Sequence, residues 1–202
     1  MTGDQMDKVG KQLKYNEAHF YSSQVPDYLK KIYPNLVDAL KMKTLDFAPF
    51  YNLITLQSRF GTKFLSFAKS AKFQKELYED LVAPHYESGD FYVETWRHGP
   101  GNIKSDCKKP TKVYNIEELS FKSMKMSFTT LKDHSKWIVN TEHDLICVGD
   151  INRQEHQKFR GGGTVCQQSK MSAVYKNLID DVEKCTNSTV ADFYRTNEIP
   201  RF

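Results

Sequence analysis

The stretch DHSKWIVNTEHDLICVGDIN, residues 133–152, indicates two neighbouring strands. Residues 135–139 and 145–148 are short apolar segments typical of strands, and polar residues separate them. Because consecutive strands are usually adjacent in space, we expect the strand near His134 to lie beside the strand that leads to Asn152. The stretch therefore predicts a sheet that contains this pair of strands.

The rest of the chain alternates between helical and extended patterns. Upstream, apolar residues at helical spacing predict a helix over 25–33 that Pro34 ends and that 36–42 can resume. Further strands are predicted at 53–56, 64–67, 91–96 and 113–121, and further helices at 74–82, closing before Pro84, and at 171–182. The three glycines at 161–163 predict a flexible loop. Interspersed helices and strands in 202 residues, 39% of them hydrophobic, predict a single mixed α/β domain over residues 1–202.

Charge and composition exclude little. The formal net charge of +4 permits a polyanionic partner without requiring one, because 25 acidic residues accompany 29 basic ones. No run of about 18 apolar residues is present, so we expect no membrane-spanning helix. Residues 1–14 are polar and lack the apolar core of a signal peptide.

The cysteines point towards an oxidising compartment. Cys107, Cys147, Cys166 and Cys185 are even in number, include no CxxC pair, and allow three disulfide connectivities. A glycosylation sequon begins at Asn187. The cysteines and the sequon indicate an exported protein, but residues 1–14 do not form a signal peptide. We therefore expect that an upstream segment is missing.

His134 and Lys136 are the candidate catalytic residues. Side chains two apart on a strand project to the same face, so the imidazole and the ammonium are expected to converge on one phosphate. Asn152 can donate its amide to a phosphate oxygen. A histidine that attacks phosphorus needs a second acid for the departing oxygen, and the stretch around His134 occurs once.

Other patterns have two explanations each. Residues 160–164 either present backbone N–H groups to an anion or form a tight turn. The lysines and phenylalanines of 63–75 form either a nucleic-acid surface or an exposed helix edge over a core; they are Lys63, Phe64, Phe67, Lys69, Lys72, Phe73 and Lys75. His143 and His156 lack the spacing of zinc ligands, so we expect solvated histidines and no metal.

Three segments resemble the deoxyribonuclease II family: 133–137, then 147–153, then 160–166. The similarity extends upstream to Lys11 and covers nearly all of this chain, but only the C-terminal half of the family. This family belongs to the phospholipase D superfamily, in which two similar α/β halves each give a His-x-Lys to one site. The resemblance implies a single phospholipase D-like half-domain with a mixed β-sheet flanked by helices. The chain departs from many superfamily members because Thr141 stands near the position of their Asp.

The resemblance also implies an activity and site roles. His134 and Lys136 would carry the second His-x-Lys, Asn152 would bind phosphate, and the first His-x-Lys would lie before Met1. The implied reaction is metal-independent, cofactor-free cleavage of double-stranded DNA at acid pH through a phosphohistidine, leaving 3′-phosphates. The implied location is the lysosome or the cell exterior. The implied disulfides are Cys107 with Cys185 and Cys147 with Cys166.

Three alternatives for function and partner remain open. An active centre requires either a homodimer of two copies or the missing N-terminal half, and DNA is the expected partner. A catalytically inactive homologue would instead bind DNA as a decoy. Phospholipid hydrolysis shares the chemistry but not the resemblance.

Overall fold

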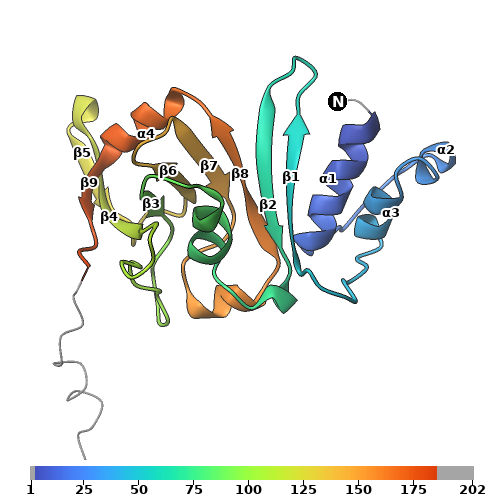
Figure 1. Ribbon diagram of the computed structural model, residues 1–202, viewed down its shortest axis with the longest axis horizontal. Helices are drawn as coiled ribbons and strands as arrows, with labels where there is room; N and C mark the ends of the chain where they lie inside the picture. Colours follow the sequence, from blue (N-terminus) through green and yellow to red (C-terminus); the bar gives the residue numbers. More distant parts are fainter. Residues whose placement is uncertain (1–2, 186–202) are drawn as a thin grey trace, which may run out of the picture.

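Nine strands form one mixed sheet in residues 3–185, the part of the chain that this computed structural model describes (Figure 1). The strands are β1 Tyr51–Gln57, β2 Lys63–Lys69, β3 Phe91–Glu94, β4 Val113–Phe121, β5 Met126–Thr129, β6 Trp137–Asn140, β7 Leu145–Gly149, β8 Gly162–Gln168 and β9 Ile179–Val182. The α-helices are α1 Gly3–Tyr15, α2 Asp27–Lys30, α3 Pro34–Leu40 and α4 Met171–Leu178. Short helical turns are η1 Ala71–Phe73, η2 Tyr78–Val82, η3 Ala83–His85, η4 Lys122–Met124 and η5 Glu155–Phe159. The predicted mixed α/β fold is confirmed.

The strand order is β1-β2-β8-β7-β6-β3-β4-β5, and β9 pairs with β4. β3 and β4 run parallel, and the other pairs of described strands run antiparallel. The predicted neighbours β6 and β7 do pair, with Ile138 opposite Cys147. The strands predicted at 53–56 and 64–67 are β1 and β2, which pair as an antiparallel hairpin.

Both faces of the central strands are buried, which explains their continuous apolar runs. Ile138 and Cys147 face one core cluster, which also contains Tyr78 from η2. Trp137 and Ile146 face a second cluster, against which α4 packs through residues such as Tyr175. Strand β6, which directly follows His134 and Lys136, is therefore packed between two core clusters.

Polar contacts attach α1 to the β1–β2 end of the sheet, at the right of Figure 1. The buried Gln12 side chain donates to both the carbonyl and hydroxyl oxygens of Ser66, at 2.8 Å each, and accepts from Asn52 at 2.6 Å. Hydrophobic patterning does not predict α1, because this helix buries amides where an apolar stripe is normally expected.

Three predicted helix boundaries are wrong. Pro34 begins α3 because its missing N–H and fixed φ suit the first turn of a helix. The helix predicted over 74–82 is the single turn η2, and Pro84 lies within the following turn η3. The amphipathic pattern at 171–182 divides between α4 and β9, because residues 179–182 pair with β4. No helix in residues 3–185 is long and apolar enough to cross a membrane.

Candidate active site

Four strand ends meet at one edge of the sheet, the lower edge in Figure 1. β3 and β7 end there, at Glu94 and Gly149, while β6 and β8 begin there, because neighbours among these four strands are antiparallel. His134 and Lys136 directly precede β6, and Asn152 follows β7. The three site residues predicted from sequence therefore share one edge.

The His134 imidazole is exposed and stacks on the Trp96 indole. The ring centroids are 4.1 Å apart and the planes differ by 24°. The amine of the half-buried Lys136 donates to the His134 carbonyl oxygen, and the Lys136 carbonyl accepts from the Gly149 N–H at 2.9 Å. These contacts join the motif to the end of β7, and the convergence of both side chains on a phosphate stays a prediction.

Acidic neighbours surround Lys136. Partial burial lowers the pKa of its amine, whereas the charges of Asp133 and Asp150 act in the opposite direction. Asp133 also accepts hydrogen bonds from the Ser135 N–H at 2.9 Å and the Ser135 hydroxyl at 2.7 Å. This local turn shapes the backbone between the two predicted catalytic residues.

Glu94 is an acidic residue of the site that the sequence analysis misses. It is 0% exposed, lies opposite Trp137 in the β3–β6 register, and neither carboxyl oxygen has a hydrogen-bond partner among the described residues. Burial, with a further contribution from Asp133, raises the pKa of Glu94 to about 9. The signal in the sequence is a lone carboxyl inside an otherwise apolar and aromatic strand.

Asn152 and Arg153 differ in their surroundings. Asn152 is 9% exposed, and its Oδ1 lacks a partner in the part of the chain that the structure describes. The Arg153 guanidinium is fully buried, pairing with Glu76 at 3.0 Å and Glu79 at 2.8 Å and donating to Asn115 at 2.7 Å. Arg153 therefore anchors the segment that carries Asn152 and is not available to a ligand.

The glycine-rich segment is not the predicted flexible loop, because Gly162 and Gly163 belong to β8. The Gly163 N–H donates to Asp150 Oδ1 at 2.8 Å, and its carbonyl accepts from the Asp150 N–H at 3.2 Å. A Cβ at Gly163 would overlap the Phe67 carbonyl, and one at Gly161 would overlap the Asn16 carbonyl. Close backbone packing explains these glycines, and the Gly163 N–H is already occupied.

Lys69 has a structural position as well. Its amine is buried and donates to the carbonyls of Gln157, Lys158 and Arg160, at 2.9, 3.2 and 2.6 Å. Phe67 lies in the core, on β2. The prediction of an exposed helix edge for this segment is wrong, because Lys63 to Lys69 form a sheet strand.

A second His-x-Lys triplet, His156-Gln157-Lys158, is passed over in the sequence analysis. It lies on the turn η5, where residues two apart point in different directions, and the Lys158 amine pairs with Glu155 at 2.9 Å. His156 is exposed. Residues 3–185 contain no group of three or more His, Cys, Asp or Glu side chains that could hold a metal ion.

The disulfides join the same cysteines that the resemblance implies, Cys107 to Cys185 and Cys147 to Cys166. Cys147 and Cys166 are directly opposite each other on β7 and β8, so this bridge lies two residues from Gly149. Asn187, the predicted glycosylation site, lies outside the described residues.

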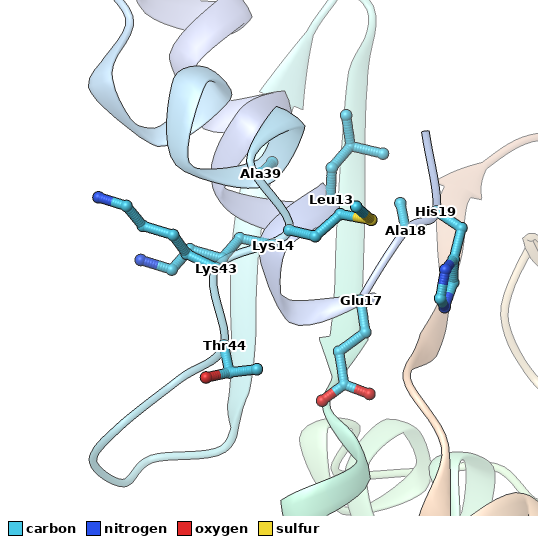
Figure 2. Close-up of a pocket in the computed structure, with 9 residues that line it drawn as sticks. Leu13, Lys14, Glu17, Ala18, His19, Ala39, Lys43 and Thr44 are labelled. Carbon is cyan, nitrogen blue, oxygen red and sulfur yellow. The ribbon is translucent and has the colours of Figure 1, made fainter. Parts of the chain in front are cut away.

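Two hollows border the segment that follows α1. Figure 2 shows the smaller, about 260 Å³, where Lys14 and Lys43 project to one side and Glu17 to another. Both lysine amines pair with Asp38, at 3.2 and 2.7 Å. The larger, about 610 Å³, extends to Asp150 and Arg160, two residues whose charges act on Lys136.

Fold and site together define a mixed α/β domain in which the residues His134 and Lys136 lie at the sheet edge where β6 begins. A family model described as Deoxyribonuclease II matches residues 1–185. The chain belongs to the deoxyribonuclease II family.

Individual relatives agree with this assignment. Plancitoxin-1 of Acanthaster planci is 39% identical over 186 residues, which are 91% of this chain and 51% of that protein. Deoxyribonuclease-2-alpha of Mus musculus is 31% identical over 183 residues, 90% of this chain and 52% of that protein. Deoxyribonuclease-2 of Caenorhabditis elegans is 36% identical over 167 residues, 82% of this chain and 44% of that protein. The chain spans about half the length of the curated relatives it matches.

Proposed function

We propose that this chain supplies one half of a deoxyribonuclease II-type active centre, which hydrolyses DNA phosphodiesters at acid pH without a metal or cofactor. The observation that carries the proposal is an exposed His134 at the sheet edge shared by Lys136 and Asn152. Family membership supports DNA as the substrate. The lysosome or the cell exterior is the proposed location.

The reaction has two displacement steps. A histidine ring nitrogen forms a bond to phosphorus while the bond from phosphorus to the 5′ oxygen breaks, and a second, protonated histidine gives its proton to that oxygen. That second histidine then takes a proton from water, whose oxygen forms a bond to phosphorus while the bond from phosphorus to the first histidine breaks, which releases the 3′-phosphate and restores the free imidazole. His134 fills one of these roles, and the Lys136 ammonium and Asn152 amide stabilise the charge on the phosphoryl oxygens.

The other histidine comes from outside this half. Two copies of the chain, or this chain and a separate N-terminal half, would bring two His-x-Lys pairs to one phosphate. Acid pH favours the reaction because an ordinary histidine titrates near 6.5 and one member of the pair must carry a proton.

A plasmid-nicking assay at pH 5 with EDTA tests the proposal. We expect cleavage by the unmodified chain, alone or with an N-terminal half, and a loss of at least a hundredfold in His134→Ala. His156→Ala is the matched control, since it removes an exposed histidine from the other His-x-Lys triplet and should leave cleavage intact. Equal cleavage by His134→Ala and the unmodified chain would contradict the proposal, and end-group analysis should find 3′-phosphates.

DNA binding without cleavage is the second candidate function. This function is favoured because the described residues place the other His-x-Lys triplet, 156–158, on a helical turn. The His134–Lys136 pair therefore lacks a matching second pair within the described residues. Retention of DNA at pH 5 that weakens steeply with salt, together with no nicking in either assembly, would identify this function.

A further inference from the structure

We infer that Trp96 is a positioning residue of the site, whose indole ring holds the His134 imidazole in a fixed plane at the sheet edge. The contact is a stack with centroids 4.1 Å apart and planes 24° from parallel. This inference deepens the proposed function, because it assigns the group that orients the proposed reacting ring.

The stack is the principal restraint on the His134 ring. Among residues 3–185, neither ring nitrogen of His134 makes a hydrogen bond. The backbone carbonyl of His134 accepts a hydrogen bond from the Lys136 amine. Both ring nitrogens are thereby left for a phosphate and for a proton acceptor from the opposing half. An exposed side chain without other restraints samples several rotamers, so a flat surface beside the ring reduces that freedom.

Trp96 is itself held rigidly. Its indole N–H donates to the Leu131 carbonyl at 3.0 Å, which ties it to the segment just before His134. The residues on either side are also fixed, since Thr95 accepts from the Arg153 N–H at 3.2 Å and Arg97 pairs with Glu183 at 3.2 Å. These contacts therefore hold the indole ring in one orientation.

The proposed reaction requires the His134 ring to be held in one orientation. A nucleophile gains rate when its reacting atom is already held close to the in-line position, and a displacement of about 1 Å can cost about a hundredfold. An aromatic face attracts a cation as well as a neutral ring, so the indole is a suitable surface for an imidazole. His98 also stacks on Trp96, with centroids 5.5 Å apart, and offers an internal comparison.

Fluorine NMR of the full chain labelled with 5-fluorotryptophan tests the contact without any cleavage. The chain has two tryptophans, so the Trp96 signal is identified by its loss in Trp96→Phe, and Trp137 serves as the internal reference. We expect the Trp96 signal to move in His134→Gln, because the ring current of the stacked imidazole is lost, and to move less in His98→Gln, whose ring lies farther from the indole. An unmoved Trp96 signal in His134→Gln would overturn the inference.

Cleavage kinetics test the consequence. Trp96→Phe keeps an aromatic face and should retain most of the activity, whereas Trp96→Leu should lower kcat by tens to about a hundredfold with little change in KM. Equal kcat values for Trp96→Leu and the unmodified chain would overturn the positioning role. If the unmodified chain cleaves neither alone nor with an N-terminal half, the proposed function fails, while the fluorine spectra still decide whether His134 stacks on Trp96.

Discussion

At the scale of single residues, Glu94 is a group beside the site whose protonation departs from that of an ordinary carboxyl. It ends β3 and is fully buried, with no hydrogen bond to either carboxyl oxygen in the described residues. An ionised carboxylate would be poorly solvated there, and this is why burial raises the pKa of Glu94 to about 9. The folded protein therefore holds a neutral acid beside Lys136 at both acid and neutral pH.

This protonation makes stability fall as pH rises. Between the ordinary Glu pKa and about 9, the folded state keeps a proton that the unfolded state has lost. The free energy of unfolding then falls with rising pH by up to about 1.4 kcal/mol per pH unit from this group. We expect Glu94→Gln to remove this dependence, so that its stability advantage over the unmodified chain grows from pH 5 to pH 8.

Urea unfolding at pH 5, 6.5 and 8 measures the effect. Glu87→Gln is the matched control, because Glu87 is exposed and its substitution should leave the pH dependence unchanged. Parallel pH profiles for Glu94→Gln and the unmodified chain would show that Glu94 is ionised in the folded state.

At the scale of elements, β8 depends on glycines for its position. Gly163 lies opposite Ala68 on β2, and its backbone also bonds to the turn at Asp150. The buried amine of Lys69 binds the carbonyls just before β8, including that of Arg160. The glycines and Lys69 together set where the turn at Asp150, and hence Asn152, stands relative to β6.

Gly163→Ala should therefore destabilise the protein. The added Cβ overlaps the Phe67 carbonyl oxygen, a backbone atom that moves only if the β2–β8 pairing shifts. We expect a loss of about 1–3 kcal/mol or more in the free energy of unfolding, measured in urea. Gln168→Ala, an exposed position on the same strand, should change stability by less than about 0.5 kcal/mol. A loss no larger for Gly163→Ala than for this control would contradict the packing argument.

The same scale shows why some elements escaped prediction. Hydrophobic periodicity indicates β6 and β7 because both of their faces are buried. It gives no signal for α1, whose buried contacts are amides such as Gln12, or for a strand that begins with glycines. It predicts one helix where the structure has α4 followed by β9, because the apolar residues of 171–182 first form a helix and then pair with β4.

At the scale of the whole molecule, one buried guanidinium joins distant parts of the chain. Arg153 contacts Glu76, Glu79 and Asn115, separated from it by 77, 74 and 38 residues. The Cys107–Cys185 disulfide spans a further 78 residues. The Arg153 contacts hold the segment after β7 against η2 and β4, and the disulfide joins the segment before β4 to the segment after β9.

Arg153→Met should be among the most damaging single substitutions. Removing one partner leaves Glu76 buried with its countercharge gone, which costs roughly 3–5 kcal/mol. Thermal or urea unfolding measures the loss, and Arg59→Met, at an exposed position, is the control. The combined Arg153→Met and Glu76→Gln variant should recover part of the stability. A smaller loss of stability in Arg153→Met than in the control would contradict the stabilising role of the Arg153 guanidinium.

The sequence by itself determined the class of fold, the central strand pair and the candidates His134, Lys136 and Asn152, because apolar patterning and short motifs are local properties of the chain. The resemblance added the family and the cysteine pairing. Only the tertiary structure decided that Arg153 is buried, that Glu94 is neutral and that His134 rests on Trp96. Burial and stacking depend on which distant segments come together, and no local pattern specifies the neighbours of a side chain across a sheet.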